Sequence, residues 1–251
     1  MPERLKPFPA GYSPEVSPEW EAMAKRINRI FLRAVTRKID IKGKENIPKD
    51  IKTSSYIIAV NHLGWAEALF LLDVFPKWIH WMSKQESFDH KLLGPIFRLL
   101  GFFPVRRGEL DRRALQTAAD LLGKGRILGM APEGTRGRGN EFGKLKEAKH
   151  GTIFVAFKTG APIIPTAVWG TEELLPLIEE NGLKLKDLTG FKPPEVHVRI
   201  GKPFAQHFEV DPGKVTRKQL EALTTNLMLE IRDLLPSKYH GFYAGIEKQP
   251  L

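Results

Sequence analysis

Two short polar clusters carry the residue types that acid–base and anion-binding chemistry needs. The first, residues 61–67 (NHLGWAE), follows the apolar run 56–60, and the second, residues 131–136 (APEGTR), follows the apolar run 127–130. A short apolar run bounded by polar residues is typical of a buried strand. Open α/β sheets keep their active sites at the carboxyl ends of strands, so we expect both clusters to contribute to one site.

The first cluster offers a base and a carboxylate. His62 and Glu67 are five residues apart, a spacing that puts them on different faces of one helix, so they do not form a helical metal pair. If a strand ends at His62 and a helix begins near Gly64, Glu67 reaches back to the imidazole. A carboxylate on Nδ1–H would fix the tautomer and leave Nε2 free as a base. An Asn-His pair after a strand, taken alone, is usually structural.

The second cluster suits an anion. Gly134 lets the backbone approach a ligand closely, and Arg136 offers a planar fork for phosphate. A glycine turn with a surface arginine gives the same pattern. A third cluster, residues 101–108, delivers two arginines into a turn, where they serve phosphate or face water. In a fourth, residues 160–166, prolines bracket an apolar strand that is structural or forms a wall for an apolar chain.

Composition narrows the classes of function. The chain has 251 residues, of which 42% are hydrophobic, enough for one sizeable domain. It has no cysteine, which excludes disulfides, thiolate metal sites and cysteine nucleophiles. A formal net charge of +10 suits a polyanionic partner, namely nucleic acid, an anionic membrane or a phosphorylated substrate, or is simply a basic surface. Neither a signal-peptide core nor a membrane-spanning run is visible, which predicts a cytoplasmic protein, soluble or attached to a membrane from one side.

The apolar pattern predicts alternating strands and helices. Strands are expected at 55–60, 78–83, 102–106, 127–131, 163–169 and 195–200, and helices at 18–38, 65–73, 89–100, 109–122, 148–159 and 216–235. This order predicts a single α/β domain with a mixed, mostly parallel sheet flanked by helices. The N-terminal helix is amphipathic and basic, which suits a membrane interface or docking on the core.

Taken in order, the four clusters resemble the glycerolipid acyltransferase family of the 1-acyl-sn-glycerol-3-phosphate acyltransferase (PlsC) type. That family carries the blocks Asn-His-x4-Asp, Gly-x5-Arg, Pro-Glu-Gly-Thr-Arg and Val-Pro-Ile-Val-Pro. The corresponding segments are 61–67, 101–107, 132–136 and 161–165, and the resemblance spans about residues 40–205. The first block departs from the family because Glu67 stands in place of Asp, which makes it an HX4E variant of the HX4D motif.

The resemblance implies roles for individual residues. His62 would be the general base for an acceptor hydroxyl, and Glu67 would orient it. The residues expected to hold the glycerol phosphate are Arg107, Glu133, Gly134, Thr135 and Arg136, with Lys84 and Lys149 as further candidates. No metal or other cofactor is implied, and acyl-CoA or acyl carrier protein would be a co-substrate.

The implied activity is transfer of a fatty acyl group from an acyl thioester to the free hydroxyl of a lysophospholipid. The expected acceptor is 1-acyl-sn-glycerol-3-phosphate, which would give phosphatidic acid in phospholipid biosynthesis. Residues 1–38 would be a lead-in and membrane-facing helix, and residues 39–251 the acyltransferase domain, peripheral on the cytoplasmic face of an anionic membrane. The alternatives are another lysolipid acceptor, a hydrolase that uses water, or a non-catalytic phosphate- or lipid-binding protein. Nucleic acid is not an expected partner because no recognised motif for it appears.

Overall fold

Seven strands form one sheet in the order β1-β9-β6-β2-β5-β3-β4. The computed structural model describes residues 14–63, 66–91, 93–106, 111–135, 143–179, 182–183, 191–204 and 215–248. The strands of this sheet are β1 (Lys38–Lys42), β2 (Tyr56–Val60), β3 (Ile79–Lys84), β4 (Phe103–Val105), β5 (Ile127–Met130), β6 (Ile163–Trp169) and β9 (Glu195–Ile200).

The strand directions bring five carboxyl ends to one edge of the sheet. From β6 through β2, β5 and β3 to β4, neighbouring strands pair in parallel. β9 pairs antiparallel with β6, and β1 pairs parallel with β9, so these two strands run the opposite way. The predicted mixed, mostly parallel sheet is therefore confirmed, and the strand ends after β2, β5 and β6 are neighbours.

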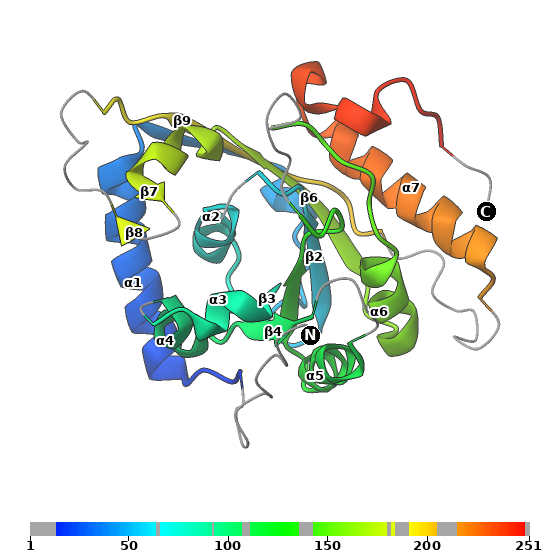
Figure 1. Ribbon diagram of the computed structural model, residues 1–251, viewed down its shortest axis with the longest axis horizontal. Helices are drawn as coiled ribbons and strands as arrows, with labels where there is room; N and C mark the ends of the chain where they lie inside the picture. Colours follow the sequence, from blue (N-terminus) through cyan, green and yellow to red (C-terminus); the bar gives the residue numbers. More distant parts are fainter. Residues whose placement is uncertain are drawn as a thin grey trace, which may run out of the picture.

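Helices cover both faces of the sheet (Figure 1). α1 and α2 lie on one face, and α5, α6 and α7 lie on the other. The α-helices are α1 (Pro18–Val35), α2 (Glu67–Val74), α3 (Gln85–Asp89), α4 (Leu93–Leu99), α5 (Arg112–Gly123), α6 (Gly151–Thr159) and α7 (Arg217–Asp233). A short two-stranded sheet, β7 (Ile178–Glu179) with β8 (Gly182–Leu183), follows a 3₁₀ segment, Thr171–Leu177.

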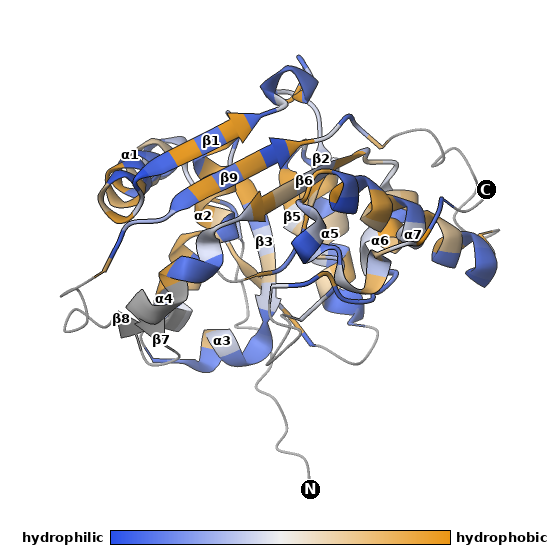
Figure 2. Ribbon diagram, turned by 90° about the horizontal axis from the view of Figure 1, so that it is seen from above, coloured by the Kyte–Doolittle hydropathy of each residue, from blue (hydrophilic) through white to orange (hydrophobic). Residues whose placement is uncertain are grey.

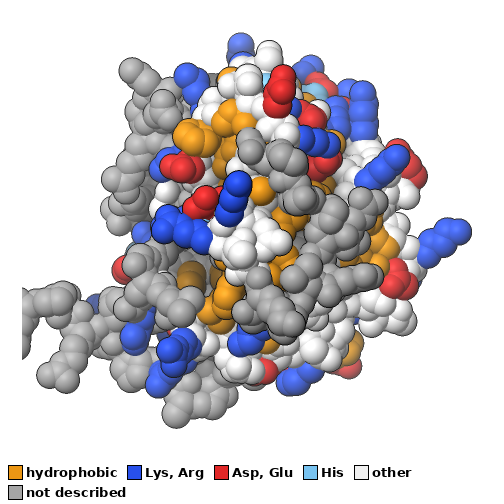
Figure 3. Space-filling model, turned by 90° about the vertical axis from the view of Figure 1, so that its right-hand side faces the viewer, with side chains coloured by type: hydrophobic (Ala, Val, Ile, Leu, Met, Phe, Trp, Pro, Cys, Tyr) orange, Lys and Arg blue, Asp and Glu red, His pale blue; other side chains and the backbone are white. Residues whose placement is uncertain are grey.

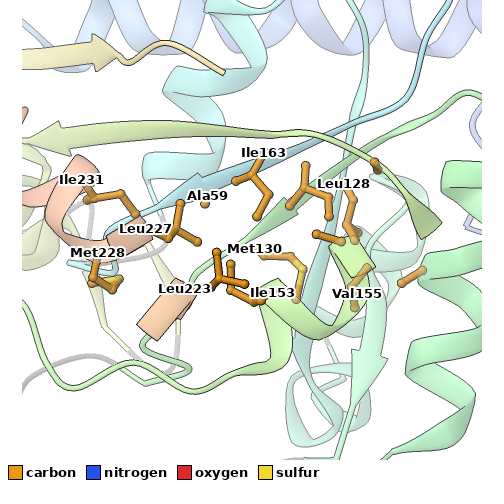
Figure 4. Close-up of a cluster of buried hydrophobic side chains, with 14 of the residues drawn as sticks. Ala59, Leu128, Met130, Ile153, Val155, Ile163, Leu223, Leu227, Met228 and Ile231 are labelled. Atoms are coloured by element: carbon orange, nitrogen blue, oxygen red, sulfur yellow. The ribbon is translucent and has the colours of Figure 1, made fainter. Parts of the chain in front are cut away.

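The sheet separates two apolar cores. Successive side chains of a strand point to opposite faces, so Ile57 and Ala59 of β2 pack with α5, α6 and α7, while Ile58 and Val60 pack with α1 and α2. Figure 4 shows the first core, in which β2, β5 and β6 meet α6 and α7. All five residues of β2 are buried, whereas β1 and β9 alternate between hydrophilic and hydrophobic residues (Figure 2). The central strands are therefore packed on both faces, which fixes the positions of the residues that follow them.

Two expectations about secondary structure are wrong. The helix predicted over 89–100 is shorter, α4 over Leu93–Leu99, and the separate helix α3 over Gln85–Asp89 precedes it. Pro95 has no N–H and its ring would clash with the Lys91 carbonyl, so α4 does not extend back to Asp89 as one continuous helix. The helix predicted to reach Lys38 ends at Val35, and β1 begins at Lys38. Ile39 and Ile41 of β1 pack on the core that also contains α1 and α2. β1 pairs with β9, which comes about 150 residues later in the chain.

No helix in the described part of the chain has both the length and the apolar character required to cross a bilayer. The division of the chain at residue 38 stays a prediction.

Candidate active site

Asn61 fixes the end of β2 to the neighbouring strand. Its side chain is 1% exposed, its Nδ2 donates to the Val168 carbonyl at 2.8 Å, and its Oδ1 accepts from the Val168 N–H at 2.8 Å. Both polar atoms of the Asn61 amide therefore have a hydrogen-bond partner on β6, which a buried polar side chain requires. The pairing sets where the chain leaves the sheet, and His62 is the next residue.

His62 and Glu67 lie beside each other, although five residues separate them. β2 ends at Val60, and α2 begins at Glu67, whose side chain is buried at 3% exposure. Glu67 Oε2 is 3.9 Å from His62 Nδ1, longer than a hydrogen bond. Glu67 Oε1 accepts from the hydroxyl of Thr171 at 2.8 Å. The carboxylate thus faces the ring nitrogen with one oxygen and is held by a hydroxyl at the other.

Glu133, in the turn after β5, binds the backbone of His62. It is 3% exposed. Its Oε1 accepts from the His62 backbone N–H at 2.8 Å, and its Oε2 accepts from the Lys146 backbone N–H at 2.7 Å. Burial raises the pKa of Glu133 to about 7, partly offset by these two backbone donors, while the charge of Glu67 adds to the rise. Both oxygens therefore bind the backbone of two loops, which places Glu133 as a link between them.

The turn after Glu133 brings a hydroxyl and two lysines together. Gly134 has φ +69°, a conformation that favours glycine. The Thr135 hydroxyl accepts from Lys146 Nζ at 3.2 Å. Lys149 is exposed, and its backbone N–H donates to the Pro132 carbonyl at 2.9 Å. An ammonium group beside a glycine turn can attract an anion at this edge of the sheet.

The remaining predicted residues fall into two groups. Lys84 is the exposed last residue of β3 and pairs in register with Val105, so it lies next to the strand end that continues into Arg106. Arg107 and Arg136 lie outside the described residues.

Two residues at this edge were missed from the sequence. Thr171 is fully buried and contacts Glu67. The signal that identified His62 also applied to Thr171, because it follows the predicted strand 163–169. Lys146 gave no such signal, since it lies in a segment without regular structure and reaches Thr135 only through the fold.

Other histidines are engaged elsewhere. His80 Nδ1 faces the Gly101 carbonyl, His150 Nδ1 faces the Thr224 hydroxyl, and His197 Nδ1 faces Asp40. Within the described residues, no three histidine or acidic side chains are grouped as a metal site would require. An imidazole whose Nδ1 faces a buried carboxylate can accept a proton at Nε2.

Known proteins similar to this chain identify its family. The family model described as Acyltransferase matches residues 38–169, a range that contains His62, Glu67 and Glu133. A 1-acyl-sn-glycerol-3-phosphate acyltransferase of Bacillus subtilis is 30% identical over 198 residues, which cover 78% of this chain and 87% of that protein. A chloroplastic 1-acyl-sn-glycerol-3-phosphate acyltransferase of Brassica napus is 29% identical over 60% of this chain, but the match covers only 43% of that protein.

A solved structure shares the fold. The crystal structure of the 1-acyl-sn-glycerophosphate acyltransferase PlsC from Thermotoga maritima aligns with a TM-score of 0.61 at 24% identity, over 85% of this chain and 78% of that one. The matching family model covers more than half of the chain, and the Bacillus relative is matched over most of both lengths. The chain belongs to the Acyltransferase family.

Proposed function

We propose that this protein transfers a fatty acyl group from an acyl thioester to the free hydroxyl of 1-acyl-sn-glycerol-3-phosphate. The observation that carries the proposal is the arrangement of Glu67 Oε2 at 3.9 Å from His62 Nδ1, at the carboxyl edge of a parallel sheet. Family membership and the name of the Bacillus relative support the same activity. The product would be phosphatidic acid, and the donor acyl-CoA or acyl carrier protein.

In the proposed reaction His62 is the general base. Its Nε2 removes the proton of the acceptor hydroxyl while the oxygen attacks the thioester carbonyl. The new C–O bond forms, the C–S bond breaks, and the proton passes from the imidazolium to the leaving thiolate. General base catalysis contributes roughly 10²–10⁴ in rate, and Glu67 would stabilise the imidazolium through its position at Nδ1.

The acceptor phosphate would bind where the cations lie. Lys146 and Lys149 flank the Gly134–Thr135 turn, and Lys84 ends β3 on the same edge of the sheet. We propose that Arg107 and Arg136, which follow strands of this edge, complete the site, because arginine binds phosphate with two parallel hydrogen bonds. Glu133 would act by holding the loops of His62 and Lys146 rather than by touching the phosphate.

A small apolar hollow, with room for about one water molecule as it stands, lies beside α2, where we propose that the acyl chain enters. It is lined by side chains of α2, β3 and the segment before β4, namely Ala68, Leu69, Leu72, Trp78, Ile79, Trp81, Leu100 and Phe102. Ala68 is the neighbour of Glu67 in α2, so the hollow begins one residue from the proposed catalytic pair. Apolar walls at that place would keep a hydrocarbon chain out of water.

α1 presents the surface that we propose docks on the membrane. Its inner face holds the buried Ala24, Asn28 and Leu32, whereas Met23, Ile27 and Ile30 are 48%, 56% and 63% exposed. Exposed arginines 26 and 33 lie beside this apolar stripe. Apolar side chains flanked by arginine are typical of a helix lying in an anionic bilayer interface.

The direction of α1 supports this docking. Lys25 Nζ contacts the Phe75 carbonyl, and Asn28 Nδ2 contacts the Leu69 carbonyl, so α1 runs antiparallel to α2. The later residues of α1 therefore lie toward the sheet edge that holds His62. Co-sedimentation with phosphatidylglycerol vesicles tests the surface: the double variant Ile27→Glu, Ile30→Glu should bind far less than wild type, and equal binding would refute the docking.

The activity itself is tested with purified protein and labelled long-chain acyl-CoA. A panel of lysolipids differing in head group is offered, with a no-acceptor reaction and the His62→Ala variant in parallel. The expected result is labelled phosphatidic acid from 1-acyl-sn-glycerol-3-phosphate, no product without acceptor, and at least a hundredfold slower transfer by the variant with lysolipid binding retained. Transfer at the wild-type rate by the variant would exclude His62 as the base.

The same assay separates the alternatives. Free fatty acid formed at the same rate with and without acceptor would indicate a hydrolase, and binding without any product would indicate a lipid-binding protein. On the face drawn in Figure 3, the visible lysine and arginine side chains are interspersed with acidic ones instead of forming one basic stripe. That distribution gives no support to nucleic-acid binding through this face.

A further inference from the structure

We propose that Thr171 is a positioning residue that orients Glu67 toward His62, so that β6 contributes to the acyl-transfer site as well as β2 and β5. The inference rests on the proposed function for its kinetic consequences, but its geometric content is independent of it.

The contact between Thr171 and Glu67 is fully enclosed. Thr171 is 0% exposed and Glu67 is 3% exposed, and the hydroxyl donates to Glu67 Oε1 at 2.8 Å. A buried carboxylate oxygen needs a donor, and this hydroxyl supplies it. With Oε1 held there, Oε2 points to His62 Nδ1. The hydroxyl therefore selects the rotation of the carboxylate that faces the ring.

The turn that carries Thr171 is itself fixed. Gly170 has φ +88°, and a Cβ at this position would run into the Glu195 carbonyl oxygen of β9. The Gly170 N–H donates to Glu172 Oε2 at 2.7 Å, and Glu172 Oε1 accepts from the Tyr239 hydroxyl at 2.6 Å. β9 and the C-terminal segment thus hold the turn from two sides, which leaves the Thr171 hydroxyl little freedom to follow a displaced carboxylate.

The chemical consequence concerns the moment when His62 would be protonated. The imidazolium then needs a carboxylate oxygen in place at Nδ1, and a preorganised group stabilises it without reorganisation. The present separation of 3.9 Å requires a small closure, which a carboxylate anchored at its other oxygen makes by pivoting. Without the hydroxyl, Glu67 would lose this anchor, and the base would be oriented in a smaller fraction of complexes.

The test compares Thr171→Val, which keeps the shape but removes the hydroxyl, with Thr171→Ser, which keeps the hydroxyl. We expect Thr171→Val to lower kcat about tenfold to thirtyfold with KM for both substrates changed less than about twofold, and Thr171→Ser to retain most of the activity. In a Glu67→Ala background, Thr171→Val should lower kcat by less than about a further twofold, because the carboxylate through which Thr171 acts is absent.

Thr166→Val is the matched control. Thr166 is 0% exposed in β6, the strand that precedes Thr171, and its hydroxyl contacts the Ile164 carbonyl at 3.3 Å. This control measures the general cost of removing a buried hydroxyl, by the same kinetics and by urea unfolding. If Thr166→Val lowers kcat as much as Thr171→Val, or if Thr171→Ser is as impaired as Thr171→Val, the inference is overturned.

A spectroscopic arm keeps this inference separate from the proposed function. In ¹⁵N-histidine-labelled protein, the His62 ring signals are assigned by their loss in His62→Ala. Thr171→Val should shift these signals and Thr166→Val should not. If wild type transfers no acyl group, the proposed function fails, while the ring signals still decide whether Thr171 positions Glu67: unchanged signals in Thr171→Val would refute it.

Discussion

Two buried carboxylates meet His62 at different groups, one at its backbone N–H and one at its ring. Glu67 and Glu133 are each 3% exposed. Glu133 accepts from two backbone N–H groups, of His62 and Lys146, while Glu67 accepts from the Thr171 hydroxyl and faces the imidazole ring. Backbone donors fix the course of loops, whereas side-chain donors fix the orientation of a functional group. We therefore expect the Glu133 region to determine stability and the Glu67 region to determine the rate of the proposed reaction.

Removing each carboxylate tests this division most directly. Glu133→Ala leaves two part-buried N–H groups without their acceptor, at about 1–3 kcal/mol each, so we expect a loss of about 2–6 kcal/mol in the free energy of unfolding. Glu67→Ala leaves one hydroxyl, that of Thr171, without its acceptor, so the free energy of unfolding should fall by about 1 kcal/mol. The rate of acyl transfer by Glu67→Ala should fall much more than the rate of Glu133→Ala. Urea unfolding of both variants, with initial rates for the folded protein, measures the two effects.

The division would be wrong if the two variants lost equal stability. A useful control is Glu172→Gln, because the hydrogen bonds of Glu172 are to the Gly170 N–H and the Tyr239 hydroxyl and not to His62. The amide oxygen of the glutamine still accepts one of these two hydrogen bonds. Its stability loss should lie below that of Glu133→Ala.

The pH dependence of stability gives the next largest effect. Burial raises the pKa of Glu133 to about 7 from an ordinary 4.5, so between these values the folded protein keeps a proton that the unfolded chain has released. The contribution of Glu133 is therefore most favourable below about pH 4.5 and is lost as the pH rises through 7, by on the order of 3 kcal/mol in total. The free energy of unfolding of wild type minus that of Glu133→Gln should fall over this range, because glutamine does not titrate. A flat or rising difference would contradict the raised pKa.

The sequence predicted where the chemistry would lie better than it predicted how the carboxylates are used. Buried runs such as 127–130 and 163–169 are strands because their apolar residues must leave water, and the strand-end rule then located His62 and Glu133. β1 was missed because its few apolar residues become a strand only beside β9, which lies far away in the sequence.

The contacts of Glu133 could not be derived from a motif. The family resemblance implied that Glu133 binds substrate, yet its two donors are the main-chain N–H groups of His62, 71 positions earlier, and of Lys146, 13 positions later. Any residue type except proline supplies such a donor, so no sequence pattern marks it. The role of Thr171 would have been easier to find from the sequence than that of Glu133. Thr171 follows the predicted strand 163–169, and the pairing of that strand with β2 is enough to bring its hydroxyl to the same edge as His62.

Shortening Glu67 sharpens the contrast on the Glu67 side. Glu67→Asp withdraws the carboxylate by one methylene, so it cannot keep both Thr171 and the position toward His62. We expect kcat to fall about tenfold, because small misplacements of reacting groups cost rates of this size, while the free energy of unfolding changes by less than about 1 kcal/mol. Equal activity of the aspartate variant would mean that the anchoring of Glu67 by Thr171 does not limit the reaction.

The smallest effect tests whether the two carboxylates influence each other across His62. Burial accounts for most of the raised pKa of Glu133, and the negative charge of Glu67 adds to it. Glu67→Gln keeps the shape and removes the charge, so the pKa of Glu133 should move down, by less than the rise that burial causes. The free energy of unfolding is measured across pH 4–8 for wild type, Glu133→Gln, Glu67→Gln and the double variant Glu67→Gln, Glu133→Gln. The difference that Glu133→Gln makes changes with pH, and the midpoint of that change reports the pKa of Glu133. In the Glu67→Gln background this midpoint should lie at a lower pH than in the wild-type background. An unmoved midpoint would make the two carboxylates electrostatically independent.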